Sequence, residues 1–116
     1  MRARKENLWL LFLLRRMGRN TVSEKQIERK LVQAVKAMGG ICPKCVSPGF
    51  DGAPDRIVLL PMGRIGFVEV KAPGKKPRPL QAARHRLLER LGFPVFTLDS
   101  AEVIERVLNE IGGDAQ

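Results

Sequence analysis

The sequence predicts an α/β fold with a mixed β-sheet flanked by helices, in the chain order α-β-β-β-α-β-α. Two observations predict it. Short runs of β-branched and aromatic residues alternate with stretches whose apolar residues recur at helical spacing, and Gly or Pro residues separate these segments. With 116 residues, of which 44% are hydrophobic, the chain is long enough for one domain with a single core.

The first helix is expected over residues 24–38. Ser23 and Gln26 have the spacing of a capping box at its start, and Gly39-Gly40 ends it. Its apolar residues share one face, and they are Ile27, Leu31, Val35 and Met38. A short extended stretch is expected over 41–46, and Pro and Gly residues then make 47–54 a loop.

A β-hairpin is expected next, with strands over 56–60 and 65–72 and a tight turn at Met62-Gly63. If Met62 and Gly63 are the whole turn, Pro61 pairs with Arg64, and Asp55 then lies opposite Val70. A bulge at Gly66 would shift this register by one residue.

The second half of the chain begins with a stiff, Pro-rich basic loop over 73–79. A second helix is expected over 80–91, a strand over 95–98, and a last helix over 101–111, capped by Asp99 or Ser100. The second helix has one apolar stripe, made of Leu80, Ala83, Leu87, Leu88 and Leu91. Arg84 lies inside that stripe and Gln81 at its edge, so this end of the helix either faces a binding site or lets Arg84 extend past its neighbours to water.

The chain carries a large positive charge, because 21 Lys and Arg residues against 12 Asp and Glu residues give +9. The excess lies in residues 1–20 and 73–91, whereas 92–116 are acidic. Such a charge favours an anionic partner, nucleic acid first and an acidic membrane surface second. Two cysteines are too few for a disulfide-stapled scaffold, and no apolar run is long enough to span a membrane.

Residues 1–20 are expected to form a basic and apolar arm that precedes a domain over 21–116. Its apolar run, 8–14, lies between basic pairs, and no small-residue cleavage site follows, so we expect no secretion signal. Two interpretations stay open for residues 1–16: they form a loosely attached arm, or translation starts at Met17.

Three charged residues are expected to converge at one end of the hairpin. Asp55 precedes its first strand, and Glu69 and Lys71 lie near the end of the second, where residues two apart share a face. A salt bridge at a strand end is the ordinary explanation. However, two carboxylates and one ammonium group leave a negative charge that a hard divalent cation would balance. Such an ion activates water and stabilises a phosphoryl transition state, so the group suits phosphodiester cleavage.

Pro54-Asp55, followed by Glu69-Val70-Lys71, resembles the PD-(D/E)XK nuclease signature. The surrounding residues make the resemblance more specific, because the chain from Ser23 to Ile111 is similar to the VRR-NUC (virus-type replication-repair nuclease) family in its short stand-alone phage form. The similar segments are 27–32, 39–40, 46–49, 52–56, 67–75 and 79–81. This resemblance implies a restriction-endonuclease-like core.

The resemblance also implies a metal site. Asp55 and Glu69 would hold Mg²⁺ or Mn²⁺ together with the backbone carbonyl of Val70. Lys71 would orient or activate the attacking water and stabilise developing charge.

Two further residues match the family pattern. Glu28 matches an acid that the first helix contributes to the metal shell; Glu24 is the alternative, and a solvated helix residue is the other explanation for Glu28. Gln81 matches a glutamine beside the active site.

Basic residues near the predicted site are expected to contact DNA phosphates, although a solvated charged loop would have the same composition. They are Lys44, Lys75, Lys76, Arg78, Arg84 and Arg86. The chain has no Tyr and only 5% aromatic residues, so we expect duplex or branched DNA rather than single strands recognised by stacking.

Cys42-Pro43-Lys44-Cys45 resembles half of a zinc knuckle, but His85 is the sole histidine in the chain and no full ligand set follows. We therefore expect no zinc and two reduced, partly buried thiols. His85 is expected on the helix surface near the DNA.

These observations favour a Mg²⁺- or Mn²⁺-dependent DNA endonuclease. The family resemblance implies a homodimer that cleaves branched, Holliday-junction-like DNA during phage replication, repair and recombination in the cytoplasm of a bacterial host. A non-catalytic basic DNA-binding module is the alternative. A basic RNA- or ribosome-binding protein would explain the charge but leave the acidic pair without a role.

Overall fold

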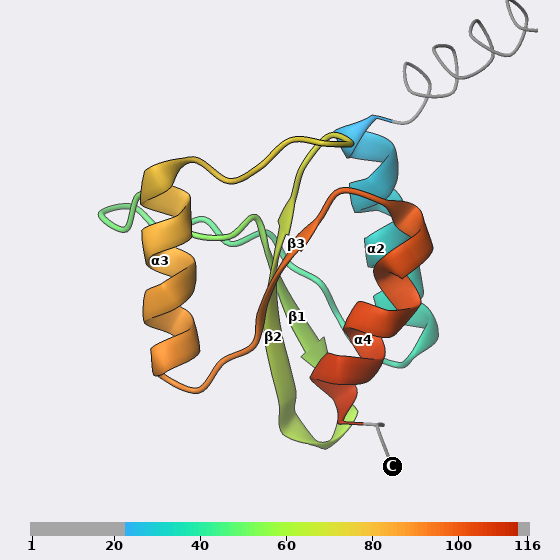
Figure 1. Ribbon diagram of the computed structural model, residues 1–116. Helices are drawn as coiled ribbons and strands as arrows, with labels where there is room; N and C mark the ends of the chain where they lie inside the picture. The colour runs from blue at the N-terminus through green and yellow to red at the C-terminus, as the bar shows by residue number, and fades with distance from the viewer. Residues whose placement is uncertain (1–22, 114–116) are drawn as a thin grey trace, which may run out of the picture.

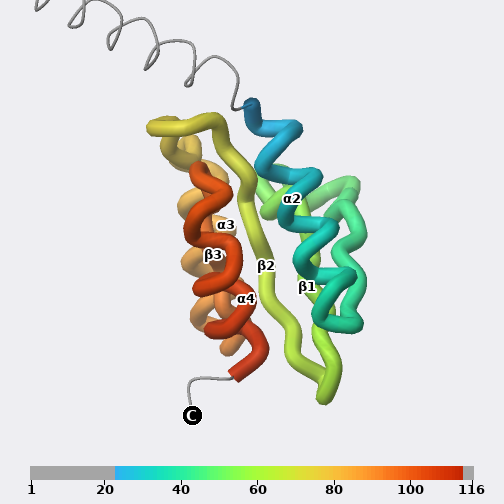
Figure 2. Tube along the Cα trace, turned by 90° about the vertical axis from the view of Figure 1, so that its right-hand side faces the viewer, coloured from blue at the N-terminus to red at the C-terminus, as the bar shows by residue number. Residues whose placement is uncertain are grey.

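In the computed structural model, which describes residues 23–113, a three-stranded sheet separates one helix from two others (Figure 1). The helices are α2 (Glu24–Ala37), α3 (Pro79–Arg90) and α4 (Ile104–Gly112), and the strands are β1 (Arg56–Leu60), β2 (Arg64–Val70) and β3 (Val95–Leu98). Figure 2 shows α2 and α4 in front of the sheet and α3 behind it. The predicted α/β class is confirmed. The predicted arm and the choice at Met17 lie outside the described residues.

The start of α2 follows directly from its sequence. The Ser23 hydroxyl accepts a hydrogen bond from the Gln26 backbone N–H at 3.2 Å, and the Gln26 side chain accepts one from the Ser23 N–H at 2.9 Å. This reciprocal pair satisfies two N–H groups that a helix start leaves without partners. Ile27, Leu31 and Val35 are fully buried, as their spacing predicts.

The hairpin register differs by one residue from the expectation for a Met62-Gly63 turn. Pro61–Gly63 form a short 3₁₀ turn, with Met62 at a φ of 71°, and Leu60 pairs with Arg64. The extra turn residue, rather than a bulge at Gly66, makes the shift. Continuing the register past Arg56↔Val68 places Asp55 opposite Glu69. β2 is the central strand, antiparallel to β1 and parallel to β3.

The extended stretch over 41–46 is not a strand, so the predicted order contains one strand too many. It touches β1 through isolated bridges at Ile41↔Leu59 and Lys44↔Arg56. Pro43, between them, has no N–H to donate to a ladder, although its carbonyl accepts a bond from the Ile57 N–H at 3.0 Å.

The predicted apolar stripe of α3 is wrong. Leu80 and Leu91 are 48% and 65% exposed, and α3 instead buries Gln81 and His85. The main core lies on the other face of the sheet, where α2 and α4 contribute Ile27, Leu31, Val35, Ile104, Val107, Leu108 and Ile111. α3 is therefore free to present polar groups to the sheet.

The two thiols are both free, as expected, but they differ in accessibility. Cys42 is 7% exposed, and burial raises the pKa of its thiol to about 11. The pKa of Cys45 is raised as well, by burial and then by the Asp55 carboxylate, but its side chain is only half-buried.

Since the thiolate is the reacting form, iodoacetamide at pH 8 should label Cys45 well before Cys42 in the native protein. Peptide mass spectrometry over time checks this order, and denaturant should abolish it.

Candidate active site

Asp55 is held at the start of β1 by both its backbone and its side chain. Its carbonyl oxygen accepts a bond from the Cys45 N–H at 2.7 Å. Its side-chain Oδ2 accepts a bond from the backbone N–H of Val70 at 2.8 Å. The carboxylate therefore reaches across the hairpin to the end of β2, which explains how two segments fifteen residues apart form one site.

Glu69 is the most deeply buried charged residue of the site, at 1% exposure. Its Oε2 accepts a hydrogen bond from Gln81 Nε2 at 2.9 Å and forms an ion pair with Lys71 Nζ at 3.2 Å. Its Oε1 is buried and has no hydrogen-bond partner among the described residues. Burial raises the pKa of Glu69, the nearby Asp55 charge raises it further, and Lys71 opposes both. Burying a carboxylate oxygen without a hydrogen-bond partner costs free energy, so a cation or a hydrogen-bond donor that binds this atom would stabilise the site.

Gln81 connects Glu69 to the start of α3. Its amide nitrogen donates to Glu69, and its Oε1 accepts a bond from the Arg78 N–H at 2.9 Å. The amide is thus oriented at both ends, and it fixes the rotamer of Glu69.

Arg84 makes two contacts that the sequence did not predict. Its Nε donates to the Asp51 carbonyl at 2.8 Å, and its guanidinium lies 4.6 Å from the centre of the Phe50 ring. Arg84 therefore holds the 47–54 loop against α3.

Glu28 is paired with a residue that the sequence analysis missed. Arg56 Nε lies 2.8 Å from Glu28 Oε2, and Arg56 Nη1 donates to the Cys42 carbonyl at 2.8 Å. Within residues 23–113, no three Asp, Glu, His or Cys side chains are gathered closely enough to hold a metal ion. The structure thus brings Asp55, Glu69, Lys71 and Gln81 together but leaves Glu28 with Arg56, and Glu24 exposed. Side chains of neighbouring residues in an extended segment point to opposite sides. An Arg directly after Asp55 therefore indicated, in the sequence, a cation on the side of the segment away from the Asp55 carboxylate.

His85 is buried, not on the surface as expected. It is 8% exposed, its Nε2 has no partner among the described residues, and burial lowers its pKa. His85 follows Gln81 by one helical turn, so it shares the face that packs on the sheet. That spacing was visible in the sequence, but the leucines of α3 suggested a different face.

The predicted DNA-contacting residues are mostly accessible. Exposed side chains belong to Lys44, Lys75, Lys76, Arg78 and Arg86, whereas Arg84 is half-buried. The basic loop is held by the Gly74 N–H, which donates to Asp99 Oδ2 at 3.3 Å, and by the Lys75 N–H, which donates to the Ala72 carbonyl at 3.0 Å.

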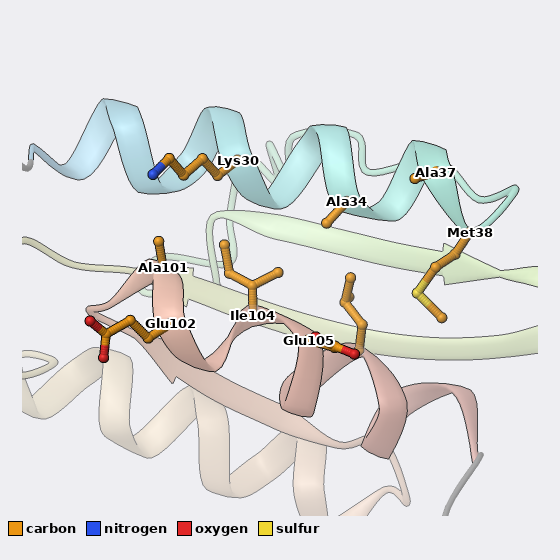
Figure 3. A pocket seen from close by; sticks show the side chains of 9 residues that line it. Lys30, Ala34, Ala37, Met38, Ala101, Glu102, Ile104 and Glu105 are labelled. Carbon is orange, nitrogen blue, oxygen red and sulfur yellow. The ribbon is translucent and has the colours of Figure 1, made fainter.

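A cavity with a volume of about 520 Å³ lies away from these residues, between α2 and α4 (Figure 3). Ala34 and Met38 project into it from α2, and Ile104 faces them from α4. None of the predicted site residues lines this cavity. The cavity is therefore separate from the cluster of buried charged residues at the end of β2.

Comparison with known proteins identifies the family, although no protein-family model matches the chain. A solved structure described as a VRR_NUC domain matches with a TM-score of 0.70 and 31% identity, covering 76% of this chain and 97% of that one. Over 82 residues the chain is 51% identical to a protein of Acyrthosiphon pisum secondary endosymbiont phage 1 named "Putative nuclease p44", covering 71% of this chain and 88% of the phage protein. The chain belongs to the VRR-NUC family. The predicted resemblance is thereby confirmed, and the phage relative agrees with the expected phage origin.

By homology this VRR-NUC protein is a nuclease, which implies a nucleic acid substrate. None of the helices within residues 23–113 has the length and apolar composition that a membrane crossing requires.

Proposed function

We propose that this VRR-NUC protein is a divalent-metal-dependent endonuclease that hydrolyses phosphodiester bonds in branched DNA. The observation that supports this most strongly is Glu69, a fully buried carboxylate with one unpartnered oxygen. Lys71 and Gln81 hold its other oxygen, and Asp55 is fixed opposite it through the Val70 N–H.

The donor atoms fit a hard cation, because Mg²⁺ and Mn²⁺ prefer oxygen ligands. Glu69 Oε1, the Asp55 carboxylate and the Val70 carbonyl would hold the ion, and Glu28 would join them if it exchanged Arg56 for the metal shell. When bound, the ion supplies Lewis-acid polarisation of the phosphate and a more acidic water. Lys71, whose ammonium lies 3.2 Å from Glu69 Oε2, would stabilise charge on the scissile phosphate and orient the attacking water, while Gln81 would keep Glu69 in place through its hydrogen bond.

The finer features are also proposals. The family resemblance and the exposed basic loop support branched DNA as the substrate and a role in phage repair and recombination in a bacterial cytoplasm. A homodimer is supported by the exposed apolar side chains Leu80, Leu91 and Phe93, which are 48%, 65% and 36% exposed. Sedimentation analysis tests the dimer.

Cleavage of linear, nicked, flapped and four-way DNA in Mg²⁺, Mn²⁺ or EDTA tests the function. We expect cutting of the branched substrates with either metal, none in EDTA, and none by Glu69→Gln, which keeps the side-chain size but loses the charge. Glu89→Gln, an exposed residue of the same helix as Gln81, is the control and should cut normally. If the wild-type protein binds DNA but cuts none of these substrates, the non-catalytic binding module replaces this proposal.

A further inference from the structure

A second basic surface lies on the side of the molecule that α2 covers. The groove there, of about 380 Å³, runs between α2 and the segment that contains Lys44. Its charged lining residues are Lys25, Glu28, Arg29, Lys44 and Arg56. We call this feature the α2 groove.

The charge of the α2 groove is strongly positive. Glu28 and Arg56 neutralise each other at 2.8 Å. Lys25, Arg29 and Lys44 are exposed and have no ion-pair partner within residues 23–113. Because Lys25 and Arg29 are four residues apart, they are spaced about 6 Å along the helix axis. The groove therefore offers a row of cations along its length, which suits a polyanion better than a single small anion.

The α2 groove begins next to the candidate active site. Arg56 lines it and directly follows Asp55, whose side chain turns to the end of β2 instead. Figure 1 shows the N-terminal ends of α2 and α3 at the same end of the molecule, with the segment after β2 passing between them. Along the chain, the groove adjoins the site through Arg56, and the basic loop that contains Lys75 and Lys76 begins shortly after Lys71.

We propose that the α2 groove binds the phosphate backbone of the nucleic acid substrate, together with Lys75 and Lys76. The proposal rests on the proposed nuclease function and adds Lys25 and Arg29 to the DNA-contacting residues expected from the sequence. With cations in the groove and in the basic loop, the backbone is held as it crosses the buried carboxylates, which on their own repel phosphate.

The test is a comparison of two triple variants that lose the same charge. Lys25→Ala/Arg29→Ala/Lys44→Ala empties the groove of its unpaired cations, whereas Lys30→Ala/Lys36→Ala/Arg106→Ala removes three exposed cations outside it. Fluorescence anisotropy in EDTA gives Kd for a four-way DNA at several KCl concentrations. Each lost phosphate contact lowers the salt slope by about 0.9, so the groove variant should lose about 2–3 in slope, and the control should stay near wild type.

Equal slopes for the two triple variants would overturn the proposal, as would competition by polyglutamate that matches competition by DNA. Circular dichroism establishes that both variants are folded, and the single variants Lys25→Gln and Arg29→Gln repeat the measurement if either triple variant is not. The outcome is separable from the nuclease assay. If the groove variant loses salt slope but the wild-type protein cleaves no DNA, only the proposed nuclease function is contradicted. If the wild-type protein cleaves DNA normally but the groove variant keeps its salt slope, only the proposal about the groove is contradicted.

Discussion

Replacing Asp55 by Asn is expected to lower the rate of DNA cleavage by at least about a hundredfold while leaving DNA binding and the fold close to wild type. The Asn side chain keeps a carbonyl oxygen that can accept the 2.8 Å hydrogen bond from the Val70 N–H, so the contact between the two hairpin strands survives. What it loses is the negative charge that the proposed metal site requires. Initial cleavage rates in saturating Mg²⁺, anisotropy and thermal denaturation measure the three properties.

Asp51→Asn is the matched control, because Asp51 is exposed and contributes only its backbone carbonyl to Arg84. It should cut like the wild type. A cleavage rate for Asp55→Asn equal to that of the control would remove Asp55 from the site. A collapse in melting temperature would instead assign Asp55 to the stability of the hairpin.

Replacing Gly40 by Ala is expected to destabilise the domain by about 3 kcal/mol, because the new methyl group has no room. A Cβ atom there would lie 2.2 Å from the backbone oxygen of Leu59 and 2.9 Å from a methyl of Leu60. The same Leu59 oxygen accepts the Ile41 N–H at 2.9 Å, and the Leu59 N–H donates to Ile41 at 2.9 Å, so relief of the clash breaks a bridge. Gly40 does not have a positive φ, so the cost is steric alone. Thermal denaturation should show a melting temperature lower by about 12–24 °C.

Gly66→Ala is the informative comparison, since the three atoms nearest to its Cβ would all be side-chain atoms of Ile111, two of them at 2.6 Å. In an Ile111→Ala background those atoms are gone, and Gly66→Ala should then cost little. The loss of stability caused by Gly40→Ala should stay the same in that background, because the clashing oxygen belongs to the backbone and no side-chain substitution removes it. A Gly40→Ala protein as stable as the wild type would show that the 41–46 segment is not held against β1 as the structure has it.

Much of the fold follows from local patterns. The capping box at Ser23, the glycines after Met38 and the apolar run before Pro61 place α2 and β1 to within a residue. The hairpin also places Asp55 near Glu69, because antiparallel strands bring their far ends together. The predictions of a strand over 41–46 and of the buried face of α3 were wrong. Local composition cannot show whether an extended segment pairs along its whole length with an edge strand, or which face of a helix packs against another element.

The same limit applies to the site. The pairing of Glu28 with Arg56 joins residues 28 positions apart, and no local pattern specifies which cation an exposed acid will choose. The register of the hairpin differed from the predicted one because a single additional residue in the turn shifts every pair of facing residues by one position.

Asp55, Glu69 and Lys71 meet at one end of a hairpin because of strand alternation and a short turn, which are local properties of the chain and can be predicted from it. The burial and the partners of each group depend instead on how the helices pack on the sheet. Packing of α3 on the sheet buried Glu69 and brought Gln81 to it, and packing of α2 gave Glu28 to Arg56 and opened the α2 groove beside the site. Burial and partner choice depend on segments distant in sequence, and it is these that turn a common triplet of charges into a candidate catalytic centre.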